Sequence, residues 1–152
     1  MATRIPPPIV AIVTAFLMWM ISILVPVGLF DLPIGMQVWL SAIIALVGMA
    51  IMFIGVFSFR KSGTTINPRK PEQASNLVLT GIYRKTRNPM YLGMLLLLSA
   101  WTIFLGSAIA FMGLPVFILF MNRFQILPEE RALEKLFGRE FGDYLLRVRR
   151  WL

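Results

Sequence analysis

Two long uncharged apolar runs open the chain, and they predict two membrane spans. Residues 9–30 and 36–59 contain no charged side chain, and each is at least as long as the roughly 20 residues that cross a bilayer core. Residues 31–35 between them include an acid, a proline and a glycine, which favours a tight turn. A cleaved signal peptide is the alternative for the first run. That run is longer than a typical signal core, however, and it lacks a small-x-small cleavage site.

Prolines mark both ends of the first span. Pro6, Pro7 and Pro8 follow one another, and because proline disfavours a helix interior we expect the helix to begin after them. Pro26 lies near the other end, where we expect it to kink the helix.

A third uncharged run extends over residues 91–121. It is long for one span and short for two spans with a loop. Gly106 and Ser107 lie in its middle, so we predict a helical hairpin with arms at residues 89–105 and 108–127. A single long tilted helix is the alternative, and it would place the C-terminal tail on the opposite side of the membrane.

The distribution of basic residues favours the hairpin. Residues 60–88 form a polar loop with seven of the fifteen basic residues, and residues 123–152 contain seven more. Basic segments beside membrane spans gather on the cytoplasmic side, so both segments are expected there. Four spans satisfy this condition and three do not. At the end of the loop, Asn88 and Pro89 predict a helix start, with Asn88 as the N-cap and Pro89 in the first helical position.

The tail at residues 128–152 predicts an amphipathic helix. Apolar residues recur in it at helical spacing, namely Leu133, Leu136, Phe137, Phe141, Tyr144 and Val148. Such a helix either lies in the membrane interface or packs beneath the spans, and Gly138 and Gly142 should break or bend it. The sequence therefore predicts an all-α, polytopic membrane protein of one domain, residues 1–152, with about four transmembrane helices and a C-terminal amphipathic helix.

Composition narrows the chemistry. The 152 residues are 58% hydrophobic and include no cysteine and no histidine, with a mean hydropathy of +0.77. Disulfides, thiolate nucleophiles, histidine triads and the usual zinc or haem sites are thereby excluded, and we expect no metal. Acid–base chemistry must rest on Glu, Asp, Tyr, Lys or a substrate group. The net charge of +8 suits a cytoplasmic membrane surface better than nucleic acid, which we do not expect as a partner.

Two polar clusters are candidates for a site, and each also has a purely structural interpretation. Residues 87–93 form a basic helix start, which is either a juxtamembrane anchor or a place where free N–H groups, Arg84 and Arg87 bind a carboxylate or phosphate. Glu129 and Glu130 follow Pro128, where acidic residues complement the first turn of a helix. Neighbouring helical residues diverge by about 100°, so we expect one carboxylate to face inward while the other meets water.

Taken together and in order, these segments resemble a known family. The segments are Gly63-Thr64, Leu77-Val78-x-x-Gly81-x-Tyr83-Arg84, Arg87-Asn88-Pro89-Met90-Tyr91-Leu92-Gly93, Glu129-Glu130-x-x-Leu133-x-x-x-Phe137-Gly138 and Val148-Arg149-Arg150-Trp151. Over about residues 55–152 the chain resembles the integral-membrane methyltransferases typified by isoprenylcysteine carboxyl methyltransferase, with the phospholipid N-methyltransferases as relatives. It departs from their pattern with Asn88 in place of a histidine, Gln125 in place of an arginine and Phe141 in place of a tyrosine.

The resemblance implies an enzyme that uses S-adenosylmethionine, bound where residues 87–93 meet the glutamate pair. It assigns to the cofactor region Tyr83, Arg84, Arg87, Asn88, Pro89, Tyr91, Gly93, Glu129 and Glu130. Within this set, the candidate catalytic residues are Glu129, Tyr91 and Arg87. Glu129 or Tyr91 would accept a proton from an amine substrate, and Arg84 or Arg87 would pair with a carboxylate.

The acceptor remains open among carboxylate, thiol and amine. We expect a lipophilic or small acceptor, together with membrane lipids as partners. We also expect a bacterial inner-membrane location, with the active site and both termini facing the cytoplasm. The alternative is a non-catalytic membrane scaffold or lipid-binding protein that keeps the same fold.

Overall fold

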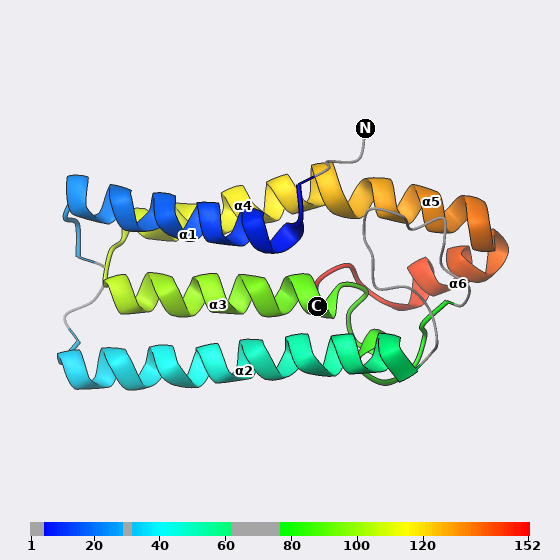
Figure 1. The fold of residues 1–152 in the computed structure, drawn as a ribbon, viewed down its shortest axis with the longest axis horizontal. Coiled ribbons are helices and arrows are strands. Elements are labelled where there is room, and N and C mark those ends of the chain that lie inside the picture. Colours follow the sequence, from blue (N-terminus) through cyan, green and yellow to red (C-terminus); the bar gives the residue numbers. More distant parts are fainter. Residues whose placement is uncertain (1–4, 29–31, 62–76) are drawn as a thin grey trace.

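The computed structural model describes residues 5–28, 32–61 and 77–152, and their architecture is helical (Figure 1). In chain order the elements are α1 (Pro7–Leu24), α2 (Ile34–Lys61), the 3-10 helix η2 (Gly81–Arg84), α3 (Pro89–Leu105), the 3-10 helix η3 (Ile109–Met112), α4 (Gly113–Met121), the π-helical turn η4 (Asn122–Ile126), α5 (Leu127–Phe137) and α6 (Arg139–Arg147). The all-α prediction is confirmed. Gly63 and Thr64, part of the resemblance, lie outside the described residues.

Three helical segments are long and apolar enough to cross a membrane, namely Pro7–Leu24, Ile34–Lys61 and Ile109–Phe137. The fourth, α3, is apolar but has only 17 residues, which is about 26 Å of helix against a bilayer core of about 30 Å. Large apolar side chains of α1 and α2 are exposed, among them Ile12 at 68% and Phe53 at 72%. Exposure of this extent fits contact with lipid, and the protein is an integral membrane protein.

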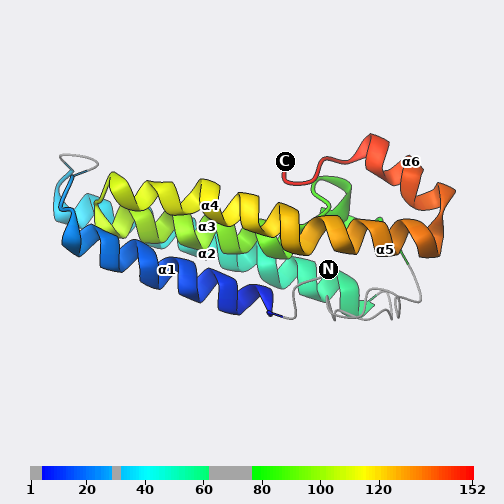
Figure 2. The same ribbon diagram turned by 90° about the horizontal axis from the view of Figure 1, so that it is seen from above.

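Helix α3 lies at the centre of the bundle, between α2 on one side and α1 and α4 on the other (Figures 1 and 2). The main core is built where α1, α3 and α4 meet, and Met18, Leu98 and Phe117 are almost fully buried there. The Trp101 indole N–H of α3 donates a hydrogen bond to the Ala15 carbonyl of α1 at 3.0 Å. The short helix is therefore held by neighbours along its length.

Two glycines bring α2 and α3 into close contact. A Cβ atom at Gly93 would lie 2.6 Å from the Gly48 carbonyl oxygen and would also meet the Met52 side chain. Small residues allow membrane helices to approach in this way. At the far end of the pair, the Gln37 side-chain amide donates to the Ile103 and Phe104 carbonyls at 2.7 and 3.0 Å. It thereby caps carbonyls of the last turn of α3, one of which, that of Ile103, also accepts the Gly106 N–H.

Helix α1 differs from the sequence prediction at both ends. It begins at Pro7 rather than after Pro8, because the first helical turn has no use for the N–H groups that proline lacks. It ends at Leu24, two residues before Pro26, so this proline stops the helix instead of kinking it.

The predicted hairpin after α3 is present. Helix α3 ends at Gly106, which has a positive φ of 59°, and the chain turns back into η3 and α4. The start of α1 and the C-terminal segment lie at the same end of the bundle (Figure 1). The single long helix considered as an alternative is therefore wrong.

The tail forms two helices rather than one. Helix α5 continues the fourth crossing, and after Gly138, whose φ is 50°, the chain reverses into α6 (Figure 2). The break predicted at Gly138 is confirmed, whereas Gly142 lies inside α6 and does not break it. The apolar face of α6 forms a second core in which Phe141, Tyr144 and Val148 pack against residues that include Leu77 and Leu133. This face is therefore covered by α5 and by the residues that precede η2, and the placement of α6 relative to the membrane stays a prediction.

We predict that Gly93→Ala destabilises the protein, because the added methyl group would force α2 and α3 apart. Overpacking of this kind costs about 1–3 kcal/mol, which thermal unfolding in detergent would detect. Gly142→Ala is the matched control. A Cβ there meets no atom within 4 Å, and alanine favours a helix over glycine by up to about 1 kcal/mol, so its melting temperature should stay or rise. Equal melting temperatures for Gly93→Ala and wild type would contradict the close contact.

Candidate active site

A small cavity lies at the end of the bundle where α2 ends, α3 begins and the chain leaves the fourth crossing. Its volume is about 80 Å³, well below the roughly 300–1,000 Å³ of a typical small-molecule site, so it suits one part of a cofactor-sized ligand. Its lining combines apolar walls with a few polar groups: Phe59, Leu77, Val78, Tyr83, Arg87, Asn88, Ile126, Glu129, Glu130, Leu133, Phe141 and Tyr144.

Glu129 is held from the α3 side. The hydroxyl group of Tyr91, in the first turn of α3, is part of a buried side chain and donates a 2.6 Å hydrogen bond to the Glu129 Oε1 atom. In the described part of the chain, Glu129 forms no ion pair with lysine or arginine. A partly buried carboxylate without a cation is costly, so a cationic ligand group beside it would be stabilising.

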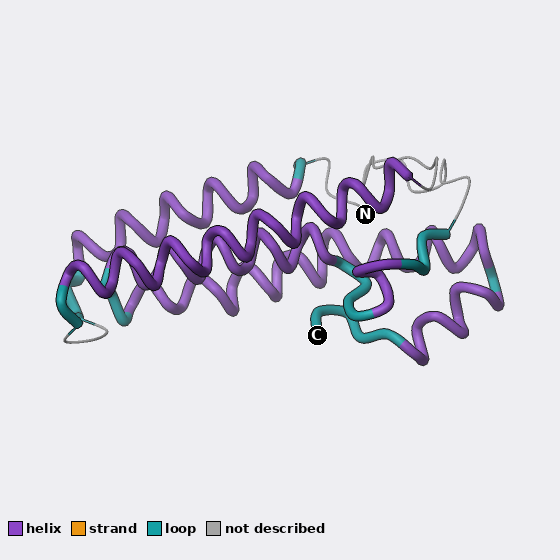
Figure 3. The backbone as a smooth tube through the Cα atoms, turned by 90° about the horizontal axis from the view of Figure 1, so that it is seen from below, coloured by secondary structure: helices purple, strands orange, loops and turns teal. Residues whose placement is uncertain are grey.

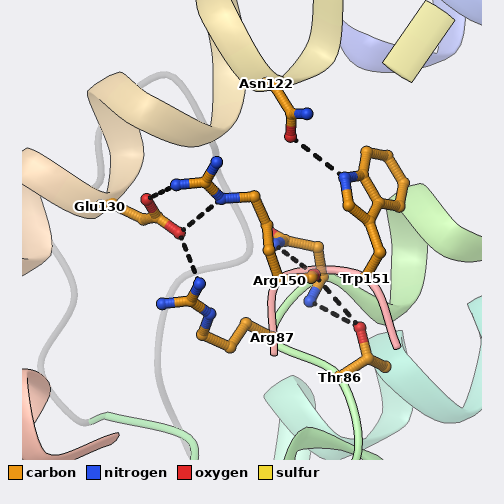
Figure 4. A network of polar contacts seen from close by, with 7 residues as sticks. Thr86, Arg87, Asn122, Glu130, Arg150 and Trp151 are labelled. Carbon is orange, nitrogen blue, oxygen red and sulfur yellow. Dashed lines mark hydrogen bonds and ion pairs between the residues drawn. The ribbon is translucent and has the colours of Figure 1, made fainter. Parts of the chain in front are cut away.

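Glu130 is held from the opposite side by two arginines (Figure 4). Arg150 donates from Nε at 3.1 Å and from Nη2 at 2.6 Å, one bond to each carboxylate oxygen. The Arg87 Nη2 atom lies 3.4 Å from Glu130 Oε1. Both glutamates therefore line the cavity, although we expected only one to face inward, and the Glu130 side chain is still 15% exposed. The reason is that the side chains of Arg87, which precedes α3, and of Arg150 in the C-terminal segment draw Glu130 inward as well.

Two buried hydrogen-bond donors at the cavity have no partner among the described residues, the Tyr83 hydroxyl and the Arg87 Nε–H. The Tyr83 side chain is only 4% exposed, and burial raises the pKa of its hydroxyl well above the ordinary value. Tyr83 therefore remains a neutral donor. Burial also lowers the pKa of Arg87, partly offset by Glu130. A buried donor without a partner costs about 1–3 kcal/mol, which a bound ligand group would recover.

Asn88 does not cap α3 as predicted. It occupies the N-cap position, but its side chain makes no capping hydrogen bond. The amide Nδ2 instead donates to the Arg150 carbonyl at 3.0 Å, and the backbone N–H of Asn88 donates to the Thr86 hydroxyl at 3.2 Å. The C-terminal segment competes successfully for the amide because it passes directly beside residues 86–88.

Three of the sequence-derived site residues lie away from the cavity. Arg84 is exposed to solvent. Pro89 is buried against α2, where a Cβ atom at Gly55 would meet its ring at 3.2 Å, and Gly93 packs against Gly48. The structure brings Tyr83, Arg87, Asn88, Glu129 and Glu130 around one cavity, and Tyr91 reaches it through Glu129.

Several residues at the site were not predicted from the sequence. Phe59 packs edge-on against Tyr83 at a ring distance of 5.1 Å, and the Tyr144 hydroxyl donates to the Tyr83 carbonyl at 2.8 Å. Thr86, Arg150 and Trp151 complete the network in Figure 4. The signal for Arg150 and Trp151 was the motif at residues 148–151, which the resemblance included without a role.

Comparison with known proteins identifies the family. A model of the phospholipid methyltransferase family matches residues 36–140, from the start of α2 into α6. The chain belongs to the phospholipid methyltransferase family. This family is related to the isoprenylcysteine carboxyl methyltransferases, and its members use S-adenosylmethionine. This phospholipid methyltransferase family member is therefore an S-adenosylmethionine-dependent methyltransferase.

One relative adds to this picture. An uncharacterized protein of Haemophilus influenzae is 52% identical over 63 residues, which are 41% of this methyltransferase and 100% of the relative. No solved structure matches the chain.

The residues at the cavity fit the cofactor's chemistry. The methionyl end of S-adenosylmethionine carries a carboxylate and an ammonium group. Among the described residues, the cavity offers two donors without partners, Tyr83 and Arg87, and one carboxylate without a cation, Glu129. The zwitterionic methionyl end could place its carboxylate at the two donors and its ammonium group at Glu129.

We predict that Asn88→Ser and Asn88→Ala each lower the free energy of unfolding by about 1 kcal/mol. The melting temperatures of the two variants should therefore fall to a similar extent. Serine caps helices as well as asparagine does, but it is too short to reach the Arg150 carbonyl. Thermal unfolding of the two variants beside wild type measures this. A stable Ser variant with an unstable Ala variant would restore capping as the role of Asn88.

Proposed function

We propose that the cavity holds the methionyl end of S-adenosylmethionine, with the ammonium at Glu129 and the carboxylate at the Arg87 Nε–H and the Tyr83 hydroxyl. The observation that carries this proposal is that one cavity is lined by two buried donors and one carboxylate for which residues 5–28, 32–61 and 77–152 supply neither an acceptor nor a cation. Charged hydrogen bonds of this kind are among the strong ones. The remainder of the cofactor would extend beyond the 80 Å³ that the cavity encloses.

The cofactor, when bound, supplies an electrophilic methyl group on a sulfonium centre. The chain's own task is to align the acceptor with that group and to keep water out, and such positioning contributes about 7–11 kcal/mol in favourable cases. Phe59 and Ile126, near the C-terminal ends of α2 and η4, together with Phe141 form apolar walls suited to this.

The acceptor that we propose is a lipophilic or small molecule at the membrane surface. The supporting observation is that two residues of the apolar walls, Phe59 and Ile126, belong to helical segments long and apolar enough to cross a membrane. An acceptor dissolved in the bilayer could therefore reach the cavity without crossing water. A carboxylate or thiolate acceptor needs no base. An amine acceptor must lose a proton, and Glu129 with its bonded Tyr91 hydroxyl is the candidate group.

The proposed orientation places this end of the bundle, and both termini, in the cytoplasm. The described residues at this end include Arg60, Lys61, Arg84, Lys85, Arg87, Arg123 and Arg131. At the opposite end, the described residues 25–28, 32–36 and 106–112 contain no charge. This split follows the rule that basic residues flank spans on the cytoplasmic side.

Calorimetry on the purified protein in detergent tests the cofactor proposal. We expect micromolar binding of S-adenosylmethionine by wild type, and affinity at least tenfold lower for Arg87→Gln, which corresponds to about 1.4 kcal/mol. Arg84→Gln is the matched control, because it makes the same charge change three residues away at an exposed site outside the cavity. Wild-type protein that binds no cofactor would refute the proposal.

Glu129→Gln separates the two roles open to Glu129. Glutamine keeps a hydrogen-bond acceptor for Tyr91 but carries no charge and takes up no proton. If Glu129 holds the ammonium group, this variant should bind S-adenosylmethionine at least tenfold more weakly. Normal binding with lost turnover of an amine substrate would instead assign Glu129 to proton transfer.

A further inference from the structure

The segment at residues 148–151 returns from α6 to the start of α3 and lies against it. In Figure 3 this loop runs beside the loop and the short helix that precede α3. The backbone N–H of Arg87 donates to the Arg149 carbonyl at 3.0 Å, and the Asn88 amide donates to the Arg150 carbonyl. On the other side, the Trp151 indole N–H donates to the Asn122 side-chain oxygen at 3.1 Å. The segment at residues 148–151 is thus anchored on both sides of Arg150, through the Arg149 carbonyl and the Trp151 side chain.

This anchoring presents the Arg150 guanidinium to Glu130. The two hydrogen bonds, at 2.6 and 3.1 Å, each reach a different carboxylate oxygen, a two-point geometry that fixes direction as well as distance. Arg87 approaches the same carboxylate only through one terminal nitrogen, at 3.4 Å. The charge of Glu130 is therefore compensated mainly by Arg150.

The division of partners has a consequence for Arg87. Because Arg150 occupies both oxygens of Glu130, Arg87 is left with a single long contact, and its Nε–H has no partner among the described residues. One carboxylate between two guanidinium groups also leaves one net positive charge beside the cavity. In the absence of Arg150, Glu130 would be free to take Arg87 in a two-point pair, which would cancel that charge.

We propose that Arg150 is a positioning residue for cofactor binding: by holding Glu130, it keeps the Arg87 Nε–H and its positive charge available to a carboxylate in the cavity. This inference rests on the proposed function, in which Arg87 contacts the cofactor's carboxylate. Arg150 itself acts through Glu130 and does not line the cavity.

Two neighbouring arginines make a matched comparison. Arg149 is exposed and contacts the site only through its carbonyl, so Arg149→Gln makes the same charge change as Arg150→Gln in the same segment without touching Glu130. The probes are S-adenosylhomocysteine, which carries the amino-acid end, and 5′-methylthioadenosine, which lacks it. Binding of both probes is measured by calorimetry on the full-length protein in detergent.

We expect Arg150→Gln to weaken S-adenosylhomocysteine binding at least tenfold while 5′-methylthioadenosine binding stays within twofold of wild type. Arg149→Gln should change neither. Arg150→Lys keeps the charge but offers one point of contact, so its loss should be intermediate. Arg150→Gln and Glu130→Gln should also be non-additive for S-adenosylhomocysteine, since they interrupt the same chain of contacts.

An equal loss for both probes in Arg150→Gln would mean general damage to the site and would overturn the inference. Wild-type affinity in Arg150→Gln, or in Arg150→Lys, would overturn it as well. Should Arg150→Gln fail to fold, Arg150→Lys is read with the same two probes. Failure of the proposed function is distinguishable, because wild type itself would then not bind S-adenosylhomocysteine.

Discussion

The hydrogen bond from Tyr91 to Glu129 is the contact on which the site depends. It joins the first turn of α3 to the first turn of α5 at 2.6 Å, across 38 positions of sequence. Glu129 is fixed from one side by this bond, and its neighbour Glu130 is fixed from the other by Arg150 and Arg87. The two carboxylates thereby point into one cavity although they are adjacent on a helix. This arrangement requires the first turn of α3 to lie beside the first turn of α5, where Tyr91 reaches Glu129.

Much of this fold follows from local patterns. Uncharged apolar runs of sufficient length can do little else than cross a membrane as helices, and Gly106 marks the hairpin because a positive φ suits glycine. The predicted helix boundaries were wrong where the position of a residue within the helix mattered more than its type. Pro7 is accommodated in a first turn, and Gly142 remains helical because α6 packs on both sides of it through Phe141 and Tyr144.

The site was less accessible to sequence reasoning, for a physical reason. Its residue types could be recognised. A glycine that binds a cofactor, however, looks the same in sequence as a glycine that lets two helices approach. The structure places Gly93 in a close contact between two helices. Asn88 has the sequence context of a cap, yet its amide bonds Arg150, 62 positions away. Contacts over such distances depend on how α6 folds back, which no local periodicity encodes.

The return of residues 148–151 to the start of α3 also bears on how the protein is assembled. Membrane helices enter the bilayer in chain order, and an intermediate with only the first three crossings would contain Tyr83, Arg87 and Tyr91 but neither glutamate. Its unpaired arginine and tyrosine would then have only water or lipid headgroups as partners. The cavity cannot be complete before α5 brings the carboxylates and the segment with Arg150 and Trp151 lies in place beside them. Recognition of a ligand at this cavity would thus require the whole of the fourth crossing and the tail that follows it.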